Sequence, residues 1–217
     1  MAIDSTAPAP SSGLRESKKQ ETRQLISDRA THLFVTQGFE QTTIAEIAVA
    51  ARVAKKTVTN YFARKEDLAL DHQDAFAASL AHTVATRRPG ESAHGALRRA
   101  FLEAAAGADP VSGFSGADFA RMVADSPTLT ACLRGLHDRR EAALAEALAS
   151  ATGTPPDDIA VRTAAGLLGT VHRLLFQRIQ ELTLAGRSDS EITRVVTEEA
   201  THAFGVLEPA LGDYAVA

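Results

Sequence analysis

The chain has 217 residues, of which 45% are hydrophobic and 23% are charged, and its formal net charge is −4 at pH 7. This length and composition indicate a folded protein of one or two domains and exclude a globally disordered chain. The single cysteine, Cys132, excludes an intramolecular disulfide, and no apolar run approaches the roughly 18 residues that cross a bilayer.

Residues 1–14 are rich in Ala, Ser and Pro and lack the basic and then apolar order of a secretory signal. We therefore expect a disordered arm over residues 1–14 and a cytoplasmic protein. Charge is unevenly distributed over the rest of the chain. Residues 14–70 contain ten Lys and Arg against seven Asp and Glu, whereas residues 71–217 contain 13 against 19. Such a basic N-terminal region can direct one end of a protein toward phosphate groups.

The first predicted helix runs from about residue 16 to residue 37. Gly38 ends it, because glycine tolerates the left-handed backbone that closes a helix, and Phe39 is suited to fold back on the last turn. A second helix opens at Thr43, whose hydroxyl can accept a free backbone N–H while Glu46 reaches back to the cap. This pair predicts a capping box.

A corner at residues 50–53 leads into a third helix over about 54–62. Two helices of about eight residues joined by a tight corner are typical of a helix-turn-helix. On the third helix, Lys55, Lys56, Thr57, Thr59 and Asn60 face outward, with the Tyr61 hydroxyl near their edge. A DNA major groove accepts one helix, and these residue types can bind base edges or phosphates. The alternative is an ordinary polar helix surface.

Two residues flank this face at helix N-termini, where backbone N–H groups and the helix dipole favour phosphate. They are Thr43 and Lys65. The alternatives are a simple cap for Thr43 and a solvated lysine for Lys65.

The remaining helices are predicted by apolar periodicity and by Gly, Pro and Asp breaks. One runs from about residue 66 past Leu80 to a break at Pro89 and Gly90, and others cover about 92–106, 115–124, 127–151, 157–185 and 189–207. No alternating strand pattern persists, so we expect an all-α fold. We predict a DNA-binding domain over residues 15–65 and a ligand-binding and dimerisation domain over residues 66–217.

The last two predicted helices have broad apolar stripes. Such a pair can bury one flank against its own domain and another against a second copy, in a two-fold four-helix contact. The candidate dimer residues are Leu167, Val171, Leu174, Val195, Val196 and Phe204. The alternative is that both helices serve only the core of one chain.

The segment "GFEQTTIAEIAVAARVAKKTVTNYFARKEDLAL" resembles the DNA-binding region of the TetR family of bacterial transcriptional regulators. The resemblance covers about residues 20–70. It implies an all-α homodimer whose two DNA-binding domains read a palindromic operator, usually as a repressor that a small ligand releases. It also implies DNA contacts by the residues that match the family's contact positions, which are Thr43, Lys55, Lys56, Thr57, Thr59, Asn60, Tyr61 and Lys65.

The sequence departs from the family pattern at several positions. Arg52 stands at the corner where the family usually has Gly, so either Arg52 adopts a left-handed backbone at roughly 1 kcal/mol or the corner differs. Ala54 replaces the usual Ser cap of the third helix, a loss of about 1 kcal/mol. Thr59 stands where an aromatic residue is common, and Ala63-Arg64 replace Pro-Ser. These departures concern base contacts rather than the docking mode.

A small-molecule pocket would be lined by apolar and aromatic residues of the second domain. The candidates are Phe76, Leu80, Phe101, Phe119, Met122, Leu133, His137, His172 and Phe176, with either histidine as a polar anchor. The alternative for each is packing in the hydrophobic core. The seven His show no metal-ligand spacing, so we expect no metal and no cofactor.

Two other classes of function are compatible with the sequence. A helical architectural protein could use the same surface without sequence preference, and an all-α enzyme is the other alternative. We find no Walker loop, dinucleotide glycine pattern or nucleophile elbow. We therefore expect a non-enzymatic regulator whose partners are duplex DNA, a small effector and a second copy of the chain, with no membrane partner.

Overall fold

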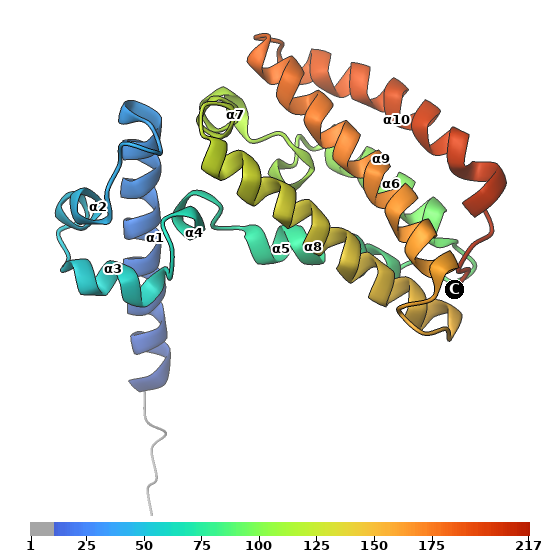
Figure 1. Cartoon of the computed structure of the whole chain (residues 1–217), viewed down its shortest axis with the longest axis horizontal. Helices are drawn as coiled ribbons and strands as arrows, with labels where there is room; N and C mark the ends of the chain where they lie inside the picture. Colours follow the sequence, from blue (N-terminus) through green and yellow to red (C-terminus); the bar gives the residue numbers. More distant parts are fainter. Residues whose placement is uncertain (1–10) are drawn as a thin grey trace, which may run out of the picture. The chain divides into compact units, whose positions relative to one another are not determined.

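The structure is a computed structural model that describes residues 11–217, with side chains from residue 15 onward (Figure 1). Over these residues it contains α-helices, one short 3-10 helix and no strand, which confirms the predicted all-α fold. The chain divides into two compact units between Asp71 and His72.

The N-terminal unit contains α1 (Ser11–Gln37), α2 (Ile44–Ala50), α3 (Lys55–Tyr61) and α4 (Glu66–Ala69). The C-terminal unit contains α5 (Gln73–Ala85), α6 (Ala93–Ala106), η1 (Pro110–Ser112), α7 (Gly116–Ala124), α8 (Pro127–Thr152), α9 (Ile159–Leu184) and α10 (Asp189–Leu211).

The arm predicted over residues 1–14 lies mostly outside the described residues, but residues 11–14 belong to α1. Extending an existing helix fixes one residue for each hydrogen bond gained, whereas nucleation fixes three. The helix therefore runs into the segment that we expected to be disordered.

The N-terminal unit is built on a buried stripe of α1, formed by Ile26, Ala30 and Phe34 at four-residue spacing. α1 packs against α2 and α4, and α2 packs against α3. Gly38 ends α1 with φ +91°, and the Phe39 ring lies 5.0 Å from the Phe34 ring. The predicted stop, with the chain folding back on the last turn, is confirmed.

The single helix predicted from residue 66 past Leu80 is wrong, because the chain breaks after α4 and restarts at α5. Asp71 lies in the break, where its carboxylate pairs with Arg23 of α1 and accepts a hydrogen bond from the Ser27 hydroxyl at 3.1 Å. These contacts hold Asp71 against α1 and interrupt the helix. The boundary between units falls a few residues after the predicted one at residues 65 and 66.

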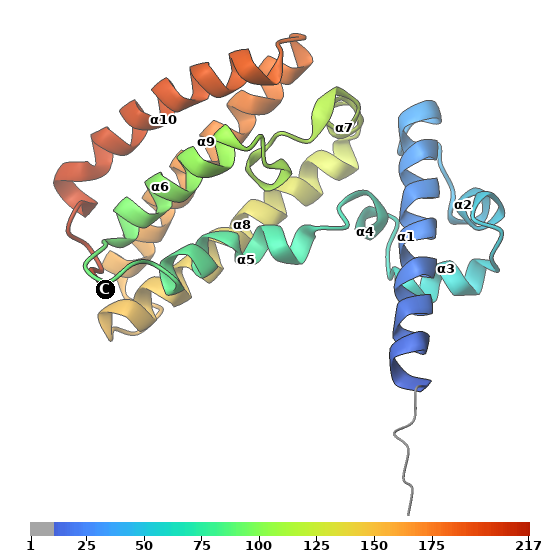
Figure 2. The ribbon, with the colours of Figure 1, turned by 180° about the vertical axis from the view of Figure 1, so that it is seen from behind.

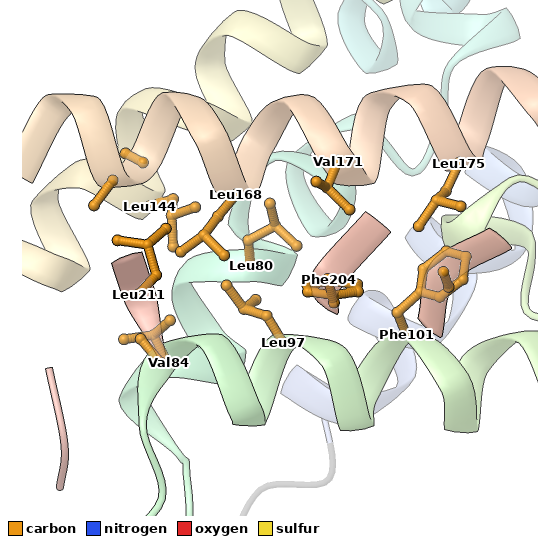
Figure 3. Close-up of a cluster of buried hydrophobic side chains, with 14 of the residues drawn as sticks. Leu80, Val84, Leu97, Phe101, Leu144, Leu168, Val171, Leu175, Phe204 and Leu211 are labelled. Carbon is orange, nitrogen blue, oxygen red and sulfur yellow. The ribbon is translucent and has the colours of Figure 1, made fainter. Parts of the chain in front are cut away.

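The C-terminal unit has α9 at its centre, between α8 and α10, with α5 and α6 covering the other face (Figures 1 and 2). α5 packs against α8, and α6 packs against α10. Figure 3 shows side chains from α9 meeting those of α5, α6 and α10 in one apolar cluster. Its labelled members are Leu80, Val84, Leu97, Phe101, Leu144, Leu168, Val171, Leu175, Phe204 and Leu211.

Helix α9 has 26 residues and contains an 18-residue stretch with a mean hydropathy of 1.2, so by length and composition alone it could cross a membrane. It also contacts α7, α8 and α10, and its buried side chains Leu168, Leu175 and Ile179 belong to the core. A core helix of a soluble domain satisfies the same length and hydropathy criteria, and its packing explains the apolar composition of α9.

Candidate nucleic-acid interface and effector site

The outward face of α3 is polar and basic. Lys55, Lys56, Thr59 and Asn60 are exposed, and their spacing places them on one side of the helix. In the part of the chain that the structure describes, no carboxylate pairs with either lysine. Both ammonium groups are therefore available to an external anion.

The opposite side of α3 fixes the helix to its unit. Val58 is fully buried and Phe62, directly after the helix, is 2% exposed. Thr57 and Tyr61 are half-buried at the edge between the two faces, and the Thr59 hydroxyl donates to the Lys56 carbonyl at 3.1 Å. The predicted outward and inward sides of α3 are thus separated in the fold.

Thr43 caps α2 as predicted. Its hydroxyl accepts the Glu46 backbone N–H at 3.2 Å and donates to the Glu46 carboxylate at 2.8 Å. The Glu46 carboxylate also accepts the Thr43 backbone N–H, and this bond is the first cause of the lowered pKa of Glu46. The capping box is confirmed. A phosphate contact by Thr43 stays a prediction, and the cap already uses the hydroxyl proton.

Lys65 is placed differently from the solvated or phosphate-binding lysine that we expected. Its Nζ donates to the carbonyls of Phe39 at 2.8 Å and Thr42 at 3.1 Å, and lies 3.4 Å from the Glu40 carbonyl. It also lies 4.2 Å over the Phe39 ring. An ammonium has three hydrogens to donate, and these carbonyls account for them. Lys65 therefore ties the start of α4 to the turn between α1 and α2.

Arg23 has a role at this site that the sequence did not suggest. Its guanidinium lies 4.4 Å over the Phe62 ring, Nη1 donates to the Tyr61 carbonyl at 3.4 Å, and Nη2 pairs with Asp71. It thus holds the end of α3 and the start of the interdomain break on α1. Its sequence signal is weak, because a basic residue on a charged helix is ordinarily exposed.

The two departures from the family pattern at the corner have distinct outcomes. Arg52 has φ +55°, so it does adopt the left-handed backbone that the family's glycine tolerates at no cost. Ala54 stands at the N-cap of α3 with an extended backbone and no side-chain hydrogen bond. The corner therefore keeps its shape despite two locally unfavourable residues.

The C-terminal unit brings most of the candidate pocket residues together through ring contacts. The Phe76, His137 and Phe176 rings meet edge-on with centroids 5.1–5.7 Å apart. The His172 ring lies 5.8 Å from Phe101 and 5.6 Å from Phe204. His172 and Phe176 are one turn apart on α9, so the two ring groups are neighbours.

The remaining candidate pocket residues are Leu80, Phe119, Met122 and Leu133. Leu80 belongs to the main apolar core. Phe119 and Met122 lie on α7, and Leu133 lies near the start of α8. No ring contact joins Phe119 to the His137 and His172 groups within residues 15–217.

Arg140 of α8 is a residue of this site that we did not predict. It is 6% exposed, its Nε donates to the Ser79 hydroxyl at 2.8 Å, and its guanidinium lies 4.5 Å over the Phe76 ring. Burial lowers the pKa of Arg140 to about 10, so the group is still charged at neutral pH. Its sequence signal was available: Leu136, Arg140 and Leu144 follow one another at four-residue spacing, which places a cation in an apolar stripe.

The two histidines near Arg140 are both held neutral. Burial, and then the positive charges of Arg140 and Arg173, lower the pKa of His137 to about 4. Burial, followed by Arg140 and His137, lowers the pKa of His172 well below its usual value. The Nε2 atoms of His137 and His172 are buried and have no hydrogen-bond partner among the described residues.

The candidate dimer residues divide into two groups. Leu167 and Leu174 are 40% and 54% exposed on α9, and Val195 is half-buried on α10. Val171, Val196 and Phe204 are buried in the core of their own chain, so their assignment to a dimer contact is wrong. They lie on the inner side of the same helices, which the broad apolar stripes did not separate from the outer side.

Comparison with known proteins places this arrangement in a family. The family described as bacterial regulatory proteins, tetR family, matches residues 26–71. The HTH-type transcriptional regulator TcmR of Streptomyces glaucescens is 32% identical over 151 residues, which are 67% of this chain and 67% of TcmR.

Two solved structures share the fold. Salmonella enterica GusR has a TM-score of 0.53 and 19% identity, covering 88% of this chain and 96% of its own. A TetR-family regulator from Streptomyces coelicolor A3 has a TM-score of 0.52 and 20% identity, covering 92% of this chain and 99% of its own. With the helix-turn-helix, the basic face of α3 and the similarity to TcmR, these findings show that the chain belongs to the TetR family of DNA-binding transcriptional regulators.

Proposed function

We propose that this protein is a repressor that binds a palindromic operator as a homodimer in the cytoplasm and leaves it when a small effector binds the C-terminal unit. The observation that carries the proposal is the exposed face of α3, where Lys55, Lys56, Thr59 and Asn60 are presented by a helix anchored through Val58. Lysine can bind guanine edges or phosphates, and asparagine can pair with adenine.

The proposal is tested by selecting bound sequences from a random duplex pool with the full chain. We expect a palindrome whose half-sites lie about 34 Å apart along the DNA, because two related helices must enter successive major grooves. Affinity for it should exceed that for random duplex by about 10³-fold or more. Binding without a sequence preference would support the architectural alternative instead, and turnover of a substrate by the purified protein would support the enzyme alternative.

Variants of α3 identify the reading helix. Asn60→Ala should weaken operator binding and relax the preference at one position of each half-site, at a cost of about 1–3 kcal/mol. Arg134→Ala, which removes an exposed charge from α8, is the control and should leave operator affinity unchanged. If the wild type and Asn60→Ala bind the operator and each of its single-base variants with equal affinity, Asn60 does not contact the DNA.

The outer apolar residues of α9 support the homodimer. Leu174 is 54% exposed, and a charge placed there would have to be buried in a two-fold contact. Leu174→Arg is expected to yield monomers in sedimentation velocity. Val49→Arg, at a position of α2 that is 78% exposed, is the matched control and should remain dimeric. A normal Leu174→Arg dimer would exclude this part of α9 from the contact.

A further inference from the structure

The C-terminal unit holds a buried positive charge without a counter-charge. Arg140 is 6% exposed, and its only polar contact among the described residues is the neutral Ser79 hydroxyl at 2.8 Å. No carboxylate of residues 15–217 forms an ion pair with it. Proteins ordinarily pair a buried charge, because removing it from water costs several kcal/mol.

Among the described residues, the surroundings of Arg140 contain no paired carboxylate but two further nitrogen groups without partners. The unpartnered Nε2 atoms of His137 and His172 are both buried, and His172 is 5% exposed as a whole residue. Phe76 contacts both the Arg140 guanidinium and the His137 ring, and Phe176, which also contacts the His137 ring, lies one turn from His172 on α9, so the three groups lie around the same rings. Three nitrogen-bearing groups from α8 and α9 therefore lie near one another without an anionic partner among the described residues.

The side chains packed around these three groups are aromatic. Phe76 lies under the Arg140 guanidinium and meets the His137 ring, whereas Phe101 meets the His172 ring. Phe176 contacts both Phe76 and His137. Aromatic rings favour a planar apolar partner in edge-on or offset contact, and they add little competing polarity.

We propose that the effector of this regulator is a small aromatic molecule with an anionic oxygen group, which Arg140 pairs with while His137 and His172 donate hydrogen bonds through Nε2. The proposal rests on the proposed ligand-released function and names the chemical class of the ligand. A planar guanidinium matches a carboxylate in bidentate geometry, and an ionised phenol offers the same charge on a single oxygen.

The proposal is tested on the full-length protein without DNA, so that its outcome is separate from operator binding. Thermal shift and titration calorimetry use matched compounds on one naphthalene skeleton. They are 2-naphthoate, the neutral 2-naphthamide, the cationic 2-(aminomethyl)naphthalene, and a 2-naphthol whose electron-withdrawing substituent keeps it ionised at neutral pH. We expect the carboxylate or phenolate to bind at least 10-fold more tightly than the amide, and the amine not at all. Equal or better binding of the neutral or cationic members, or no binding by any member at millimolar concentration, would overturn the proposal.

Variants at Arg140 separate binding from structure. Arg140→Met keeps the length and apolar contacts of the side chain and removes the unpaired charge, so it should melt at the same temperature as the wild type or higher. It should also lose anion binding by 10-fold or more, and Arg140→Lys should retain part of it. A lower melting temperature for Arg140→Met with unchanged anion affinity would show that the arginine only holds Phe76 and Ser79 in place.

The same anions distinguish a carboxylate from a phenolate as the recognised group. We compare the ratio of carboxylate affinity to phenolate affinity in the wild type with the same ratio in His172→Phe. A change in this ratio reports whether one or two donors contact the ligand oxygen. We expect His172→Phe to weaken both anions and to fold as the wild type does by circular dichroism. Unchanged affinity of both anions in this variant would remove His172 from the site.

Discussion

Backbone strain at a single residue shows how this chain keeps its family's corner without its family's glycine. Arg52 has φ +55°, a conformation that costs a non-glycine residue about 1 kcal/mol or more. Arg52→Gly should therefore raise the free energy of unfolding by up to about 1 kcal/mol in urea denaturation. Arg52→Ala retains the Cβ and is the control. If Arg52→Gly and Arg52→Ala have the same free energy of unfolding, the backbone at this corner is not strained.

Lys65 gives the second prediction at the residue scale. Lys65→Met keeps an unbranched side chain and removes the donors to the carbonyls of Phe39 and Thr42. We expect the free energy of unfolding of the N-terminal unit to fall by about 1–3 kcal/mol, because part-buried carbonyls lose charged donors. Lys55→Met, on the exposed face of α3, should leave it within about 0.5 kcal/mol. Equal stability of the two variants would restore Lys65 to the role of a solvated lysine.

At the scale of elements, most helix ends could be predicted because local chemistry sets them. Gly38 closes α1, and Thr43 caps α2 in a capping box with Glu46. The break between α4 and α5 could not be predicted, because Asp71 is held by Arg23 from a helix far earlier in the chain. Periodicity alone continues through residues 66–80.

The packing of α10 provides the prediction at this scale. Phe204 is fully buried and contacts the His94 and His172 rings of α6 and α9. Phe204→Ala should lower the free energy of unfolding by about 3–5 kcal/mol, through lost burial and the cavity that remains. Chemical denaturation, followed by a signal that reports on the C-terminal unit, measures this free energy of unfolding. A variant that keeps its stability but sediments as a monomer would instead return Phe204 to the dimer contact.

At the scale of the whole molecule, the buried histidines make stability depend on pH. The pKa of His172 is lowered in the folded state, so below about pH 6.5 the unfolded chain binds a proton that the folded chain does not. Stability is therefore complete above pH 6.5 and falls as pH decreases, by roughly 1.4 kcal/mol for each pH unit while His172 stays neutral.

Denaturation midpoints between pH 7 and pH 5 check this expectation. His172→Phe removes the titrating group and should flatten the pH dependence, while His137, whose pKa is lowered to about 4, continues to contribute. The same slope in both proteins would show that His172 binds its proton equally well in the folded and unfolded states.

The amino-acid sequence by itself determined most of the helices, the helix-turn-helix and the polar face of α3, because caps, most breaks and helical periodicity depend on neighbours within a few residues. The tertiary structure decided which side of α9 and α10 is core, that Lys65 bonds to three carbonyls, and that Arg140 lies buried beside His137 and His172. These outcomes depend on which distant helices pack together. A side chain's burial and charge partners are therefore set by the assembled fold rather than by its own helix.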